Sequence, residues 1–93
     1  MKREDLESID ANKVLLVDIR EADEVAVLPS LPNAIHVPMS KLVDELAQGT
    51  LPHDKTIVTI CMTGNRCHTV NAFLEMNGFR TDLLEGGMSG LQK

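Results

Sequence analysis

The 93-residue sequence predicts an α/β fold with a four- to five-stranded, mainly parallel sheet and helices on both faces. Two observations predict this fold. Short apolar runs rich in Val, Ile and Leu alternate along the chain with segments whose apolar residues recur at helical spacing. The apolar runs are continuous, as is typical of strands buried on both faces of a sheet. A hydrophobic fraction of 43% suits one compact core, so we expect a single domain over residues 1–93.

The first half of the chain predicts two strands, each followed by a helix. Residues 14–17 form the first apolar run, and residues 21–27 predict a short helix that ends before a proline-containing loop. Residues 34–37 predict the second strand. Ser40 is a suitable N-cap for the helix after it, and Gly49 is placed to end that helix.

The second half begins with the strongest strand pattern, the β-branched run at residues 56–60. The helix that follows carries apolar side chains at helical spacing as far as Leu74. Gly78 suits the C′ position, and we expect Phe79 to fold back against Leu74 in a Schellman motif. A short strand over residues 81–84 and a Gly-Gly turn into a short helix complete the order of elements.

Charge and composition exclude several classes of partner. The formal net charge of −5 argues against nucleic acid or an anionic membrane as the main partner. The sequence contains no apolar stretch that could span a bilayer and no apolar signal region, so we expect a cytoplasmic location. In that compartment the two cysteines are expected to be reactive, metal-binding or buried rather than joined in a permanent disulfide.

Cys61 directly follows the strand at residues 56–60 and precedes a helix. The carboxyl ends of parallel strands meet at one edge of the sheet, where ligands bind in folds of this class. Asp18 and Glu85 also follow predicted strands, so we expect both to lie at the same edge as Cys61. Glu85 is interpreted as a loop support or a solvated carboxylate rather than an acid–base group.

The loop after Cys61 contains residues suited to holding an anion: Met62, Thr63, Gly64, Asn65 and Arg66. Gly64 and Asn65 tolerate the left-handed conformations that turn backbone amides towards a bound anion. Arg66 adds a positive charge. Such surroundings lower the pKa of a cysteine from its free value of about 8.5, which favours the nucleophilic thiolate. The alternative is that Cys61 is an inert residue of the core.

Five segments in this order resemble the rhodanese domain family over nearly the whole chain. They are Leu-Val-Asp-Ile-Arg-Glu at 16–21, Ala-Ile-His-Val-Pro at 34–38, the loop at 61–66, Asn-Gly-Phe at 77–79 and Leu-Glu-Gly-Gly-Met at 84–88. The resemblance implies a rhodanese-like fold and a sulfurtransferase that uses neither a metal nor an organic cofactor. It also implies that Asp18 and Arg20 support the active-site loop and the neighbouring segments rather than act in catalysis. If the two residues form a solvent-exposed ion pair, that pair contributes little to stability.

The resemblance further implies the chemistry and the partners. Cys61 would take the outer sulfur of a small anionic donor such as thiosulfate, forming a persulfide, and would pass it to cyanide or a thiol acceptor. The amides from Met62 to Arg66 would stabilise the persulfide anion. Phosphatases and arsenate reductases of this fold have one more residue between cysteine and arginine, so the shorter ring here suits one sulfur atom better than phosphate. The alternative is a catalytically weak module for protein interaction, or for redox sensing through Cys61 and Cys67.

Three features depart from the family pattern. The loop at residues 28–34 lacks the glycines and the histidine of many relatives, and no Trp follows the Gly-Gly turn. Cys67 stands where many relatives carry Ser. It could fill space, relay sulfur, or form a disulfide with Cys61 if their Cα atoms lie within about 7 Å.

A zinc site is the remaining alternative for the cysteines. The possible ligands are Cys61, Cys67, His36, His53 and His68. They contain no Cys-x2-Cys pair and no paired histidines, so no metal site is expected. His68 is expected at the lip of the site or exposed on the first helical turn, and His53 in a solvated loop.

Overall fold

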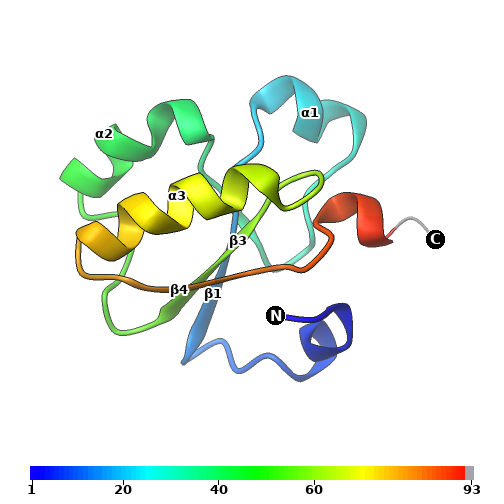
Figure 1. Ribbon diagram of the computed structural model, residues 1–93, viewed down its shortest axis with the longest axis horizontal. Helices are drawn as coiled ribbons and strands as arrows, with labels where there is room; N and C mark the ends of the chain where they lie inside the picture. Colours follow the sequence, from blue (N-terminus) through cyan, green and yellow to red (C-terminus); the bar gives the residue numbers. More distant parts are fainter. Residues whose placement is uncertain (92–93) are drawn as a thin grey trace.

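The structure, a computed structural model, describes residues 1–91 and confirms the α/β fold (Figure 1). Four parallel strands lie in the order β2-β1-β3-β4, with bounds Ile35–His36, Val14–Asp18, Thr56–Ile60 and Arg80–Leu83 respectively. The α-helices are α1 Ala22–Val27, α2 Leu42–Ala47 and α3 Asn65–Met76. Three 3-10 helices complete the described chain: η1 Arg3–Ser8, η2 Met39–Lys41 and η3 Met88–Leu91.

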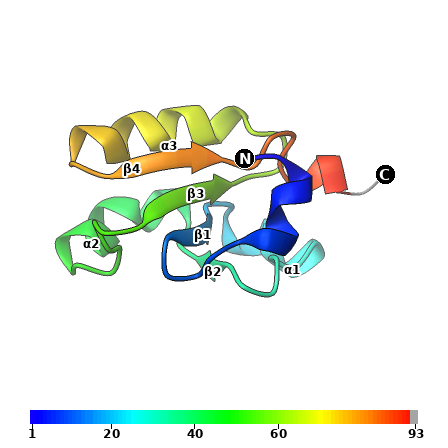
Figure 2. The ribbon, with the colours of Figure 1, turned by 90° about the horizontal axis from the view of Figure 1, so that it is seen from below.

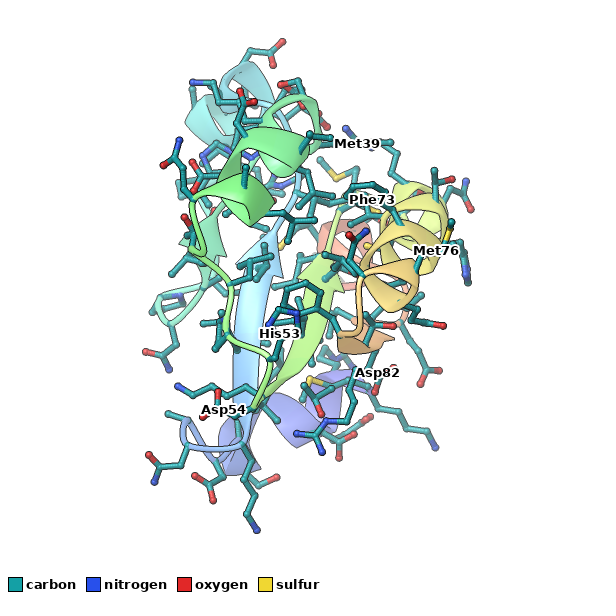
Figure 3. The ribbon with its side chains drawn as sticks, turned by 90° about the vertical axis from the view of Figure 1, so that its left-hand side faces the viewer. Met39, His53, Asp54, Phe73, Met76 and Asp82 are labelled. Atoms are coloured by element: carbon teal, nitrogen blue, oxygen red, sulfur yellow. The ribbon has the colours of Figure 1, made fainter. Side chains whose placement is uncertain are left out.

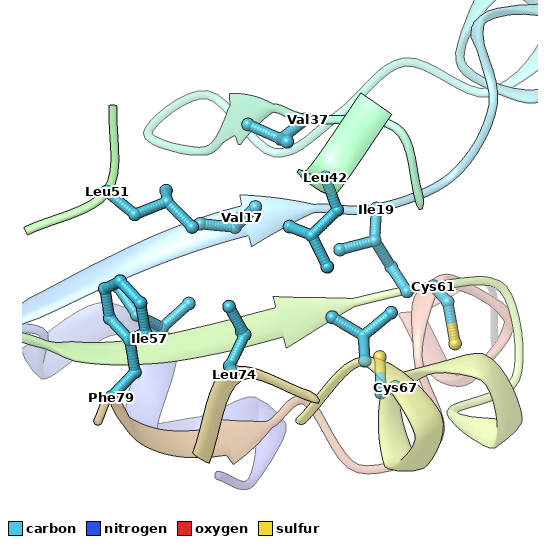
Figure 4. Close-up of a cluster of buried hydrophobic side chains, with 11 residues drawn as sticks. Val17, Ile19, Val37, Leu42, Leu51, Ile57, Cys61, Cys67, Leu74 and Phe79 are labelled. Carbon is cyan, nitrogen blue, oxygen red and sulfur yellow. The ribbon is translucent and has the colours of Figure 1, made fainter. Parts of the chain in front are cut away.

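Two clusters of buried side chains lie on the two faces of the sheet. The larger cluster packs between the sheet and helices α2 and α3, and includes Val17, Ile57, Leu42, Val70 and Leu74 (Figure 4). The smaller cluster includes Leu16, Val58, Ile60, Leu84 and Met88. This second face is covered by η1, η3 and the loop at residues 28–34 rather than by α-helices. Successive residues of β1 and β3 enter opposite clusters, as the pleat of a buried strand requires.

The strand order identifies the edge of the sheet at which a ligand site is expected. From β1 the chain moves outward to β2, whereas from β3 it moves outward to β4 in the opposite direction. The central pair β1 and β3 is therefore the switch point, beyond whose carboxyl ends ligands bind in open α/β sheets. The Ile19 amide donates to the Ile60 carbonyl at 2.9 Å, which holds the two strand ends together. Figure 2 shows β3 and β4 pointing towards the edge where α1 and the C-terminal turn lie.

The sequence predicts the residues that end α3 and begin α2; the first prediction is confirmed and the second is wrong. At the end of α3, the Gly78 amide donates to Glu75 and the Phe79 amide to Leu74, both at 3.1 Å, and Gly78 has φ of +87°. This is the expected Schellman motif. Ser40, by contrast, is not the N-cap of α2. It lies within η2, and its hydroxyl donates to Glu21 Oε1 at 2.6 Å.

None of the helices in the described part of the chain has the length and apolar character needed to cross a membrane.

Candidate active site

Cys61 follows the carboxyl end of β3, and the loop that begins at this residue covers its sulfur. The Cys61 residue is 1% exposed, and the Gly64 amide donates to its Sγ at 3.0 Å. Gly64 has φ of +98°, a conformation that favours glycine, and it turns the chain directly into α3. Of the two residues that tolerate this conformation, only Gly64 adopts it, because every positive φ in the described chain belongs to glycine. One glycine therefore produces the turn that points an amide at the sulfur.

Arg66, at the other end of the loop, forms a bidentate ion pair with Glu24 of α1. Its Nη1 donates to Oε1 at 2.7 Å and its Nη2 to Oε2 at 2.6 Å. The hydrogen bonds from Arg66 lower the pKa of Glu24 to about 2, and the same contact raises the pKa of Arg66. The two side chains are 36% and 28% exposed, so the pair lies at the rim of the site. Sequence reasoning missed Glu24, because no local pattern links residues 42 positions apart.

The turn at Gly86 and Gly87 and the start of η3 hold the loop after Cys61 through backbone hydrogen bonds. The Met88 amide donates to the Cys61 carbonyl and the Ser89 amide to the Met62 carbonyl, both at 2.8 Å. Gly87 has φ of +56°, and a Cβ there would lie 2.4 Å from the Cys61 carbonyl oxygen. Backbone can approach this closely only where there is no side chain. The sequence indicated a Gly-Gly turn but not that the turn contacts the cysteine.

Asp18 and Arg20 form a fully buried ion pair, not a solvent-exposed one. Both residues are 0% exposed, and Arg20 Nη2 donates to Asp18 Oδ2 at 2.8 Å. Arg20 also donates to the Leu28 carbonyl, and the Ser30 hydroxyl to Asp18, each at 2.8 Å. Burial raises the pKa of Asp18, but the hydrogen bonds from Arg20 and Ser30 outweigh it and lower the pKa. The pair thus holds the loop that begins at Leu28.

Cys67 lies on the first turn of α3, and its side chain is completely buried in the larger cluster near Cys61 (Figure 4). Burial raises the pKa of this thiol to about 12. At neutral pH the thiol is therefore protonated, and a protonated, buried thiol is a poor nucleophile. These features favour space filling, while sulfur relay and disulfide formation stay hypotheses.

The other predicted polar residues do not gather around Cys61. Glu85 follows β4 at the same edge, but its side chain is 61% exposed. His36 forms a hydrogen bond through Nε2 to the Arg20 carbonyl at 2.6 Å, and His68 is exposed on α3. His53 is exposed yet not merely solvated, since it stacks on Phe79 with ring centroids 3.9 Å apart.

The histidines are also separated from one another. Figure 3 shows His53 beside Asp54, which precedes β3 at the end opposite to Cys61. Among residues 1–91, no three or more His, Cys, Asp or Glu side chains are grouped so that they could hold a metal ion.

Known proteins of similar sequence and structure identify the family. A model of the rhodanese-like domain matches residues 3–93. "Putative sulfurtransferase YtwF" of Bacillus subtilis (strain 168) is 40% identical over 83 residues, covering 88% of this chain and 78% of that protein. "Sulfurtransferase" of Allochromatium vinosum is 34% identical over 80 residues, covering 85% and 72%. The crystal structure of SSP1007 from Staphylococcus saprophyticus is 33% identical, with a TM-score of 0.83 over 97% of this chain and 89% of that one. This chain therefore belongs to the rhodanese-like domain family.

Proposed function

We propose that this protein is a sulfurtransferase that carries a sulfane sulfur as a persulfide on Cys61. The observation that carries the proposal is the contact of 3.0 Å between the Gly64 amide and Cys61 Sγ, at the switch point of the sheet. An amide in this position stabilises negative charge on sulfur. The names of the two related sulfurtransferases support the same class of reaction.

The first half-reaction loads the cysteine. The Cys61 thiolate attacks the outer sulfur of a donor such as thiosulfate, a bond forms from Sγ to that sulfur, and the donor's S–S bond breaks. Sulfite leaves with the electron pair of that bond, and Cys61 is left with a terminal persulfide sulfur. The amides of the loop, namely Met62, Thr63, Gly64, Asn65 and Arg66, would hold this anionic sulfur as they would an oxyanion.

The second half-reaction returns the thiolate. Cyanide or a thiol acceptor attacks the terminal sulfur, the bond to Sγ breaks, and Cys61 keeps the electron pair. The covered position of Cys61 limits contact of the persulfide with bulk water. Asp18 and Arg20 act at a distance, by fixing the loop at Leu28 and Ser30 beside the site.

Mass spectrometry after incubation with thiosulfate tests the proposal. We expect one added sulfur atom on the peptide that contains Cys61, and its removal when cyanide is added. Cys61→Ser should accept no sulfur, whereas Cys67→Ser, the matched control, should be loaded like the parent. If Cys61→Ser transfers sulfur as well as the parent, the proposed mechanism is wrong.

The second candidate is a protein-interaction module that performs little or no catalysis. The burial of Cys61 and the neutralisation of Arg66 by Glu24 favour it. This candidate predicts that Cys61 remains unloaded with every sulfane donor, under conditions in which circular dichroism shows a folded protein.

A further inference from the structure

The arginine of the Cys61 loop is already paired with a carboxylate, although a rhodanese donor such as thiosulfate is a dianion. Arg66 is the cation at the end of the loop, and Glu24 already binds both of its terminal nitrogens. Arg20 is buried and held by a carboxylate of its own. An incoming dianion therefore meets no unpaired guanidinium among these side chains.

On the basis of the proposed function, we propose that Glu24 determines donor specificity. By neutralising Arg66 it makes the site select organic persulfides, which carry at most one negative charge, over the thiosulfate dianion. Thiosulfate that approaches Cys61 brings a charged sulfonate group to a loop whose terminal cation, Arg66, is already neutralised by Glu24. A persulfide whose organic part is uncharged carries at most one negative charge and meets weaker repulsion. The bidentate contact makes this arrangement persistent, because two parallel hydrogen bonds fix both side chains.

The reaction with an organic persulfide is balanced without a further reagent. The Cys61 thiolate attacks the terminal sulfur of R–S–SH, and a bond forms from Sγ to that sulfur. The donor's S–S bond breaks, and its electron pair leaves with the organic sulfur as the thiolate RS⁻. The proton stays on the transferred sulfur, so the products are the Cys61 persulfide and one thiolate.

The test compares two donors on the complete chain. The rate of persulfide formation on Cys61 is followed by intact mass, with either thiosulfate or 2-hydroxyethyl persulfide, at low ionic strength. The proteins are the parent, Glu24→Gln and Asp23→Asn. Asp23 is the matched control, because it is an exposed carboxylate on the same helical turn that makes no contact with Arg66 in the described structure.

We expect Glu24→Gln to raise the second-order loading rate with thiosulfate by about tenfold, from the removal of one negative charge beside a dianion. Loading from hydroxyethyl persulfide should change by less than about threefold, and Asp23→Asn should change either rate by less than about threefold, since exposed, more distant charges are screened. In the parent, added salt should speed loading from thiosulfate, because it screens repulsion.

Each of the following results would overturn the inference. Equal gains in Asp23→Asn would show a general effect of charge. A loss with both donors in Glu24→Gln would show that Glu24 only positions Arg66. Slower loading of the parent from thiosulfate with added salt would show net attraction, and this measurement needs no variant. If neither donor loads Cys61 in any protein, the proposed function itself fails; if both load it in unchanged ratio, only the specificity role of Glu24 fails.

Discussion

At the scale of single residues, burial decides what Asp18 and Arg20 contribute. A surface ion pair is worth little, but this pair is completely buried and holds Leu28 and Ser30 through further hydrogen bonds. Removal of one partner leaves the other as an uncompensated charge in the core. The sequence motif Asp-x-Arg indicates a pair of charges, and only the burial of both residues makes that pair structurally necessary.

Asp18→Asn tests this point. We expect the free energy of unfolding to fall by about 3–5 kcal/mol, because the buried guanidinium of Arg20 loses its carboxylate partner. Urea denaturation measures the change. Asp23→Asn, an exposed carboxylate, should change stability by no more than about 0.5 kcal/mol. Equal stability of Asp18→Asn and the parent would mean that the pair is not needed for the fold.

Cys67 provides the second prediction at this scale. With its pKa raised to about 12 by burial, this thiol should resist alkylation by iodoacetamide at pH 8 in the folded protein and react fully in urea. Peptide mass spectrometry measures the difference. Cys67→Ser should also match the parent in sulfur transfer and in recovery from peroxide. Slower recovery of Cys67→Ser would instead support sulfur relay or a disulfide with Cys61.

At the scale of elements, the loop at residues 61–66 depends on the turn that precedes η3. Two amides of η3 hold the carbonyls of Cys61 and Met62, and Gly87 provides the space for this contact. The loop is therefore supported by an element that lies far along the chain. A glycine that is explained locally as a turn residue also controls the position of Cys61.

Gly87→Ala should displace this loop. The added Cβ would lie within 2.4 Å of the Cys61 carbonyl oxygen, so the backbone must shift. A displacement of about 1 Å can reduce the rate of persulfide formation by roughly a hundredfold. Gly49→Ala is the matched control, since Gly49 also has a positive φ, of +72°, but nothing lies within 4 Å of its Cβ position. It should lose about 1–2 kcal/mol of stability and keep its loading rate. Equal loading rates in the two variants would contradict the role of Gly87.

At the scale of the whole molecule, the strand order brings α1 and α3 together over the switch point. Glu24 and Arg66 meet there although they are far apart in sequence, and their pair links the first helix to the active loop. The net charge of −5 is also unfavourable to anions, and the paired Arg66 does not offset it. The fold therefore sets both the position of the site and its electrostatic character.

The link between α1 and α3 predicts a dependence of stability on pH. The pKa of Glu24 is lowered from 4.5 to about 2 in the folded protein. A carboxyl with a lowered pKa contributes stability above its unfolded value and loses that contribution as pH falls through its folded value. The difference in stability between the parent and Glu24→Gln should thus be constant above about pH 5 and shrink as pH falls towards 2. Urea denaturation at pH 7, 4 and 3 measures it, and a constant difference would contradict the lowered pKa.

The sequence by itself determined the succession of strands and helices along the chain, the Schellman motif at the end of α3 and the position of Cys61 before a glycine turn. These features depend on β-branched runs, apolar spacing and backbone conformations of neighbouring residues, which local sequence encodes. The tertiary structure alone decided the burial of Asp18 and Arg20 and the pairing of Glu24 with Arg66. These depend on which surfaces pack together across the sheet, and a partner 42 residues away leaves no trace in the local pattern.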